Sequence, residues 1–331
     1  MNKFIVSPSI FKQLPLIHKR LFTQVPILKN TLTEEEPVLT ESHQSTRTMI
    51  LNRPKKLNAF TLPMIKMMAS YFKGRGRALG TGADIKALTD AINDPSRRHE
   101  LDGFIDVAYS AFHAFETAKK PVVTLMDGLA VGGAFSFSIL SRFNVATENT
   151  KIMMPETRFG HFCDVGANFY LPRLKGNIGK YIALTAQMIH AEDALHFGLA
   201  THFVPADRLD YVEDCLINLD RPSDENIRAT IDRFSIKLDD IATGKMMHDR
   251  NKSIIDRCFR FDTIAEILAA LQDEGSRFSL DTIEQICQGS PISAALTLEQ
   301  MRKGSKMTYS ECLQMEYKSW KITPVRKSLV F

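Results

Sequence analysis

Residues 121–139 carry the pattern that most constrains the fold: a buried strand, a glycine turn and a helix in direct succession. The stretch PVVTLMD is apolar and rich in β-branched residues, and GLAVGGAFSFSIL follows it at once. A second glycine loop, LGTGADI at 79–85, also runs into a helical stretch. Because strand, glycine turn and helix recur, the N-terminal half is predicted to be mixed α/β.

The remaining pattern predicts a change of architecture along the chain. Strands are expected at 38–51, with a turn inside, and at 143–146, 151–153 and 201–204. From Arg208 onwards the pattern is almost entirely helical, with helices expected near 209–219, 224–237, 262–272, 280–288 and 292–303. We therefore divide the 331 residues into a tail at 1–33, an α/β core at 34–207 and a helical region at 208–331.

The first 33 residues differ from the rest in charge. They hold five Lys or Arg and no acid, interleaved with bulky apolar residues. This composition is typical of a mitochondrial transit peptide, and a disordered basic tail is the alternative. Without these five charges the formal charge of +4 becomes −1, so the body gives no reason to expect direct nucleic-acid binding.

Composition argues against several other classes of protein. No apolar run approaches the length needed to span a bilayer, so we expect no membrane partner. The five cysteines contain no C-x-x-C pair, and the histidines form no H-x-x-x-H motif. We therefore expect reduced thiols and no metal site.

The two glycine loops, 79–85 and 130–135, are candidates for anion binding. A glycine turn followed by a helix presents backbone N–H groups and the positive end of the helix dipole. Two such loops facing one another would form an oxyanion hole, whereas either loop alone is better explained as a tight turn. Neither loop has the spacing of a dinucleotide fingerprint or a P-loop, so a nucleotide phosphate is not the expected ligand.

Two carboxylates stand in the apolar stretch MMPETRFGHFCDVG at 153–166. Glu156 follows a predicted strand, and Asp164 lies on irregular backbone between glycines. Partial burial would raise a carboxyl pKa and make the group a better base or nucleophile. A helix cap at Glu156 and a loop salt bridge at Asp164 are the alternative on spacing alone.

The order of several motifs resembles the crotonase (enoyl-CoA hydratase/isomerase) superfamily. These motifs are RTMILNRPKKLNAF, GADIKAL, KPVVTLMDGLAVGGAF, ATENTKIMMPETRFGHFCDVG, LPRL and GLATHFV. The resemblance covers roughly residues 37–310 and implies a spiral of β-β-α turns with a mostly helical C-terminal region. It also implies an acyl-CoA substrate, no separate cofactor, and assembly into a homo-oligomer.

Site residues follow from the resemblance position by position. The N–H groups of Ala83 and Gly133 match the oxyanion donors, which would hold the thioester oxygen as it gains charge. Glu156 matches the catalytic glutamate, acting as a nucleophile or activating water, while Asp164 would bind a substrate hydroxyl and help proton transfer. The substrate and CoA would also contact residues of two segments: Lys55, Lys56, Leu57, Asp84 and Ile85.

Within the superfamily the chain is most similar to the hydrolases of 3-hydroxyisobutyryl-CoA, which implies thioester hydrolysis in valine breakdown in the mitochondrial matrix. Enoyl-CoA hydration is an alternative, but hydratases carry a second glutamate where Ser136 stands here. A second alternative is a non-catalytic component of the mitochondrial ribosomal small subunit. It is motivated by two departures from the family pattern: only FKGRGR stands at 72–77, where a hydrophobic strand is expected, and EYKSWKITPVRKSLVF closes the chain.

Overall fold

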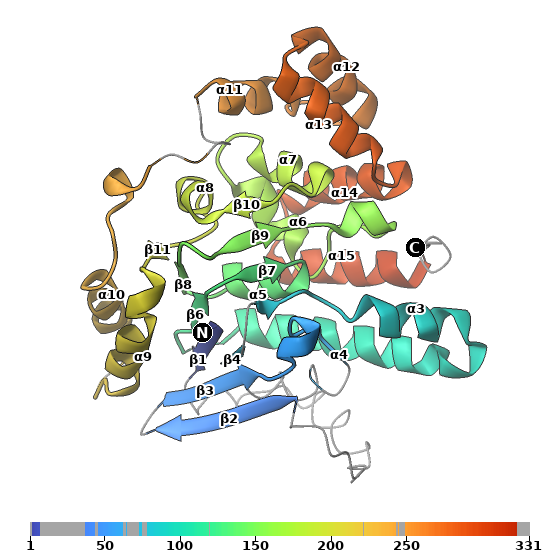
Figure 1. Ribbon diagram of the computed structural model, residues 1–331. Coiled ribbons are helices and arrows are strands. Elements are labelled where there is room, and N and C mark those ends of the chain that lie inside the picture. The colour runs from blue at the N-terminus through green and yellow to red at the C-terminus, as the bar shows by residue number, and fades with distance from the viewer. Residues whose placement is uncertain are drawn as a thin grey trace.

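The computed structural model describes residues 2–6, 37–43, 46–61, 64, 73–74, 78–118, 120–220, 222–242, 244 and 249–322. The strands belong to two sheets (Figure 1). The larger has the order β11-β8-β6-β1-β4-β3-β2 and the smaller the order β10-β9-β7-β5. The strands are β1 (Asn2–Val6), β2 (Val38–His43), β3 (Thr46–Leu51), β4 (Lys73–Gly74), β5 (Ala78–Gly80), β6 (Val123–Met126), β7 (Leu129–Val131), β8 (Phe143–Ala146), β9 (Lys151–Met153), β10 (Ile189–His190) and β11 (His202–Phe203).

From β4 to β9, successive strands alternate between the two sheets, which makes this part of the chain a spiral. β6 of the large sheet leads to β7 of the small one, and β8 leads in the same way to β9. The repeated strands pair in parallel, β6 with β8 and β7 with β9, so each turn of the spiral stacks on the one before. The predicted spiral of β-β-α turns is confirmed.

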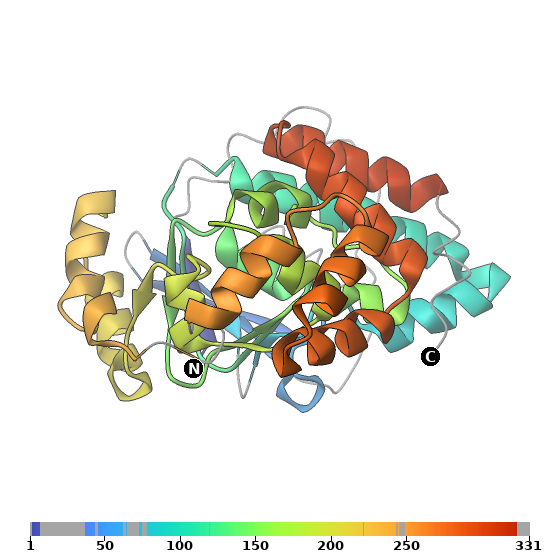
Figure 2. The same cartoon turned by 90° about the horizontal axis from the view of Figure 1, so that it is seen from above.

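The helices surround the sheets and dominate the C-terminal part of the molecule (Figures 1 and 2). Side chains that accept a backbone N–H at the helix N-terminus explain several starting points, among them Asp84, Ser223, Thr263, Ser276 and Ser290. The α-helices are α3 (Ile85–Asn93), α4 (Arg98–Glu116), α5 (Gly133–Ile139), α6 (Ala167–Tyr170), α7 (Ile178–Thr185), α8 (Ala191–His196), α9 (Leu209–Ile217), α10 (Asp224–Asp232), α11 (Asp249–Cys258), α12 (Ile264–Glu274), α13 (Arg277–Cys287), α14 (Pro291–Gly304) and α15 (Tyr309–Ile322).

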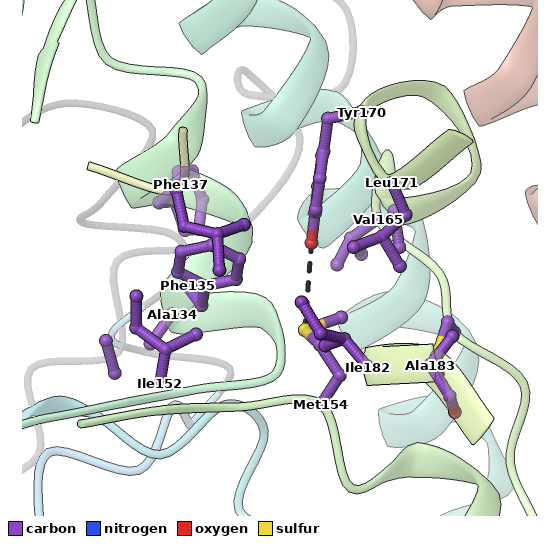
Figure 3. Packing of buried hydrophobic residues seen from close by; sticks show 14 of the residues in the cluster. Ala134, Phe135, Phe137, Ile152, Met154, Val165, Tyr170, Leu171, Ile182 and Ala183 are labelled. Atoms are coloured by element: carbon purple, nitrogen blue, oxygen red, sulfur yellow. Dashed lines mark hydrogen bonds between the residues drawn. The ribbon is translucent and has the colours of Figure 1, made fainter. Parts of the chain in front are cut away.

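Two groups of apolar side chains form the core. The smaller group packs α9 and α10 against one face of the large sheet, where Val123 and Leu125 point toward them. The larger group fills the space between the sheets and the other helices. Figure 3 shows a part of this larger group, where Phe135 of α5 lies near Ile152 of β9, and the Tyr170 hydroxyl contacts the Met154 sulfur at 3.7 Å. The glycine turn before α5 therefore stands on a densely packed base.

The N-terminal segment differs from the sequence-based expectation. Asn2–Val6 forms β1, which pairs antiparallel with β3 on one side and with β6 on the other. Phe4 is the register partner of both Met49 and Thr124. The expectation of a disordered tail is therefore wrong for these five residues, whereas residues 7–36 lie outside the described part of the chain. The boundaries of the three regions stay a prediction.

The segment directly before the loop at 79–85 contains a strand, although FKGRGR at 72–77 suggested that none precedes this loop. Ala78–Gly80 forms β5, which pairs in parallel with β7 and leads directly into the second glycine loop. A paired strand therefore supports this loop. In the large sheet, β1 lies between β6 and the pair β3 and β4. The helix expected from Thr61 falls largely outside the described residues.

Most other elements lie where the sequence predicts them. β8 and β9 have the predicted bounds, and the stretch where one or two strands were predicted forms β2 and β3, which pair antiparallel. Helices α11 and α15 were not predicted, and both carry a high proportion of polar residues. Among the described residues, no helix has the length and apolar composition needed to cross a membrane.

Candidate active site

A cavity of about 120 Å³ opens between the two glycine loops, the carboxylate segment, α4 and α15. Most of its wall is apolar, contributed by Phe60, Ile85, Leu88, Phe104, Ile105, Phe112 and Trp320. Both glycine loops reach it, through Gly82 and Ala83 on one side and Gly132 and Gly133 on the other. Glu156 and Asp164 line the same cavity. Four residues predicted to act together, Ala83, Gly133, Glu156 and Asp164, are therefore brought to one place.

The loop before α3 presents the N–H group of Ala83. The backbone N–H of Phe60 donates to the carbonyl of Gly82 at 2.7 Å, and the N–H of Asp84 donates to the Phe60 carbonyl at 2.8 Å. These two bonds flank Ala83, and its own N–H has no acceptor among the described residues. Gly82 has φ +74°, a left-handed conformation that favours glycine.

The loop before α5 presents the N–H group of Gly133. Gly132 has φ +54°, and its N–H donates to the carbonyl of Met153 at 2.9 Å, which ties the loop to β9. Gly133 is the first residue of α5, so its N–H belongs to the free first turn of a helix. A Cβ placed on Gly82 would lie 3.4 Å from the Gly133 nitrogen, which shows how closely the two loops approach. Together they have the features of an oxyanion hole.

Glu156 begins a 3-10 turn, Glu156–Phe159, just after β9. Pro155 precedes this turn and Gly160, at φ +80°, ends it. Only 5% of Glu156 is exposed, and a Cβ on Gly132 would lie 2.7 Å from its Oε1. The carboxyl group is therefore held directly against the glycine turn, at the end of a strand in the rigid part of the fold.

The surroundings of Glu156 change its acidity. Burial raises the pKa of this carboxyl to about 8, and the negative charge of Asp164 adds to the shift. The Cys163 thiol lies 3.7 Å from Oε2 and donates to it, which acts in the opposite direction. A carboxyl with this pKa is a much stronger base, once ionised, than an ordinary glutamate.

Asp164 is tied into the site through one of its two oxygens. The Tyr109 hydroxyl lies 3.2 Å from Oδ2, and His161 Nε2 lies 3.1 Å from the same atom. Burial, followed by the charge of Asp164, raises the pKa of Tyr109 well above its usual value, so this hydroxyl stays protonated and donates. Among the described residues Oδ1 has no hydrogen-bond partner.

The loop that follows Asp164 is anchored by α15. Glu316 is fully buried, and its carboxylate accepts the N–H of Gly166 at 2.8 Å and the N–H and side-chain amide of Asn168 at 3.3 and 2.8 Å. Burial, with the charge of Asp164, raises the pKa of Glu316 to about 8. Gly166 has φ +93°, and a Cβ there would lie 2.4 Å from the Tyr309 ring. The C-terminal helix is therefore part of the site's framework.

Most of the predicted substrate- and CoA-binding residues do not line the cavity. Lys55 and Lys56 are exposed on a short turn, and the Leu57 carbonyl accepts the Thr81 hydroxyl at 3.4 Å, which joins this turn to the glycine loop at 79–85. Ile85 lines the cavity. Asp84 does not: it caps α3 and pairs with Arg53 at 3.3 Å. Its contacts are those of a structural residue.

The position relevant to enoyl-CoA hydration carries no acid, and neither does the nearby stretch of α4 that lines the cavity. Ser136 is completely buried, and its hydroxyl lies 3.0 Å from the Tyr170 hydroxyl. Ala108 lines the cavity, while Asp106, two residues earlier on α4, accepts the Tyr317 hydroxyl at 2.8 Å. Glu156 and Asp164 are therefore the carboxylates among the described residues that line the cavity.

Sequence reasoning missed three residues that line the cavity: Tyr109, His161 and Trp320. The spacing of His161 and Asp164, three residues apart, was a usable signal for their pairing. Tyr109 and Trp320 are brought there by α4 and α15, and no local pattern marks them. Among the described residues, no group of three or more His, Cys, Asp or Glu could hold a metal ion.

Comparison with known proteins places this geometry in a family. Residues 46–323 match the enoyl-CoA hydratase/isomerase family. The mitochondrial 3-hydroxyisobutyryl-CoA hydrolase of Homo sapiens is 34% identical over 295 residues, which is 85% of this chain and 76% of that protein. The corresponding protein of Gallus gallus is 35% identical over 285 residues, with 81% and 73% covered.

Solved structures agree with the sequence comparison. A carnitinyl-CoA dehydratase from Mycobacterium thermoresistibile superposes with a TM-score of 0.78 at 27% identity, over 89% of this chain and 87% of that one. An enoyl-CoA hydratase from Rhodobacter sphaeroides 2.4.1 gives a TM-score of 0.75 at 25% identity, over 88% and 85%. Because the family match covers most of this chain, the chain belongs to the enoyl-CoA hydratase/isomerase family.

Proposed function

We propose that this protein is an enzyme that hydrolyses the thioester of 3-hydroxyisobutyryl-CoA, or of a related short β-hydroxyacyl-CoA, to the free hydroxy acid and CoA. The observation that carries the proposal is the meeting of Ala83, Gly133, Glu156 and Asp164 in one mostly apolar cavity. Relatives named as 3-hydroxyisobutyryl-CoA hydrolases, at 34% identity over most of the chain, support the choice of substrate.

Each of these four groups has a role in the proposed hydrolysis. The N–H groups of Ala83 and Gly133 hold the thioester oxygen, which gains negative charge as the carbonyl is attacked. Ionised Glu156 either attacks this carbonyl to give an anhydride, which water then opens, or removes a proton from the attacking water. The C–S bond breaks, the CoA sulfur takes a proton, and the water oxygen remains in the product acid.

The elevated pKa of Glu156 gives this mechanism a pH dependence. The carboxyl is mostly protonated in the free protein at neutral pH, since burial raises its pKa to about 8. Only the ionised form can act as a base or a nucleophile. We therefore expect kcat/KM to rise with pH up to about 8, because this ratio reports the protonation of the free enzyme.

Hydration of an enoyl-CoA receives less support from the site. By the family resemblance that reaction uses a second glutamate at the position of Ser136, whose hydroxyl here contacts Tyr170 and does not line the cavity. A serine hydroxyl also cannot replace a carboxylate in this role. The ribosomal alternative has no observation in the structure that favours it.

Location, assembly and cofactor use complete the proposal. The curated relatives are named as mitochondrial, and the acid-free basic composition of residues 1–33 agrees with import into the matrix. We propose a homo-oligomer with an acyl-CoA as its only ligand, because the mechanism above needs no separate cofactor. Exposed Lys55 and Lys56 remain the candidates for the CoA phosphates.

The experiment that tests the proposal measures release of free CoA from 3-hydroxyisobutyryl-CoA by the full chain. Turnover that disappears in Glu156→Gln is the expected result. Exposed Glu225→Gln, which removes the same charge far from the cavity, serves as the matched control and should retain turnover. A folded wild-type protein that releases no CoA would refute the proposed function, and an active Glu156→Gln would refute the mechanism.

A further inference from the structure

His161 is the residue in the cavity wall that the proposed mechanism does not use. Its Nε2 lies 3.1 Å from Asp164 Oδ2, and its backbone N–H donates to the Glu156 carbonyl at 3.0 Å. The centroid of the His161 ring lies 4.5 Å from the ring centroid of Phe162 and 4.9 Å from that of Trp320. These contacts fix the imidazole in one orientation between the two carboxylate-bearing positions.

The surroundings of the ring indicate which of its nitrogens carries the proton. Nδ1 is buried and has no hydrogen-bond partner among the described residues. A proton on Nδ1 would be buried without an acceptor, whereas a proton on Nε2 forms a hydrogen bond with Asp164, so the proton on Nδ1 is disfavoured. The proton therefore sits on Nε2, where it is donated to Asp164.

Asp164 consequently receives two donors on the same oxygen. The Tyr109 hydroxyl, which burial keeps protonated, is the other donor to Oδ2, at 3.2 Å. Two donors on Oδ2 set the plane of the carboxylate, while Oδ1 has no partner among the described residues and belongs to a side chain that lines the cavity. A carboxylate oxygen fixed in this way accepts a hydrogen bond from a ligand hydroxyl.

We propose that His161 is a positioning residue for substrate selection: with Tyr109 it fixes Asp164 so that Oδ1 accepts the hydroxyl of a β-hydroxyacyl thioester. This inference rests on the proposed hydrolysis. The selection arises because a substrate without the hydroxyl leaves Oδ1 of Asp164 without a donor in a mostly apolar cavity. Loss of His161 frees the carboxylate to rotate, and the preference for the hydroxyl declines.

The test compares kcat/KM for 3-hydroxyisobutyryl-CoA and isobutyryl-CoA, which differ by the one hydroxyl. A hydrogen bond to a charged group typically gives about 10- to 100-fold discrimination, so the wild-type ratio should lie in that range. In His161→Leu the ratio should fall about tenfold, with the loss on the hydroxylated substrate. His161→Gln should restore most of it, because its amide can donate to Asp164 in place of Nε2.

Two further variants keep the test decisive. Tyr109→Phe removes the other donor with the loss of a single oxygen, so it tests the same arrangement if His161→Leu does not fold. Glu225→Gln removes an exposed carboxylate outside the cavity and should keep the wild-type ratio. Equal losses on both substrates, or an unchanged ratio in His161→Leu and Tyr109→Phe, would overturn this inference alone. A wild-type protein that hydrolyses neither thioester would overturn the proposed function and this inference with it.

Discussion

Replacing Glu156 by glutamine should abolish thioester hydrolysis and at the same time stabilise the fold at neutral and alkaline pH. Burial raises the pKa of this carboxyl from the usual 4.5 to about 8. The folded protein therefore holds a proton between pH 4.5 and 8 that the unfolded chain releases. Stability falls with rising pH in this interval, because the native state binds more protons than the unfolded state.

The magnitude follows from the size of the shift. Each pH unit above 4.5 costs the wild-type protein about 1.4 kcal/mol, until the folded-state pKa is reached. Relative to Glu156→Gln, whose side chain does not titrate, this cost grows from about 1 kcal/mol at pH 5 to about 4 kcal/mol at pH 8. With an unfolding entropy of about 2.1 cal/mol/K per residue, 4 kcal/mol corresponds to a difference in Tm of about 6 °C.

Thermal unfolding followed by circular dichroism from pH 5 to pH 8 measures this difference, with CoA release recorded on the same samples. Glu316 is buried with a similarly raised pKa in both proteins, so its contribution cancels to first order. Glu225→Gln is the control for removing an exposed carboxylate and should follow the wild type. A difference in Tm between Glu156→Gln and wild type that does not change with pH would refute the reasoning.

Three further predictions concern the framework of the site. Gly132→Ala should lower kcat by about 100-fold with little change in secondary structure, because its Cβ would meet Glu156 Oε1 at 2.7 Å; unchanged steady-state kinetics would contradict this. Glu316→Ala leaves the buried N–H groups of Gly166 and Asn168 without an acceptor, so we expect urea denaturation to show a loss of about 3 kcal/mol; a loss below ~1 kcal/mol would argue against the anchor. Deleting residues 1–6 should lower the free energy of unfolding by about 0.5–1.5 kcal/mol for each lost interstrand hydrogen bond; a free energy of unfolding equal to that of the full chain would show that β1 contributes nothing.

Much of the α/β core is predictable because its signals are local. The apolar run of β6 and the glycines that follow it fix a strand, a turn and a helix within a few residues of one another. The carboxylates were found in the same way, since Glu156 and Asp164 stand out in an apolar stretch. The raised pKa of Glu156 and the pairing of His161 with Asp164 depend on packing, which the sequence does not display.

The remaining parts depend on contacts between distant segments. Tyr109 reaches Asp164 across 55 residues, and Glu316 reaches Gly166 across 150. Asp84 was expected at the substrate, but its own helix and Arg53 take both carboxylate oxygens. Helix α15 has a mixed polar sequence, and its role becomes apparent only where Glu316 and Trp320 meet the carboxylate segment.

The place of β1 has a consequence for how this protein matures. β1 lies between β6 and the pair β3 and β4, with Phe4 in register with both β3 and β6. A processing protease that cut the chain after residue 6 would leave two strands inside a finished sheet with exposed edges, and such edges invite pairing with foreign strands. Removal of these residues and completion of the sheet would thus exclude one another. A chain that keeps residues 2–6 has a complete sheet, whereas a chain that loses them must close the gap or bind a strand from elsewhere.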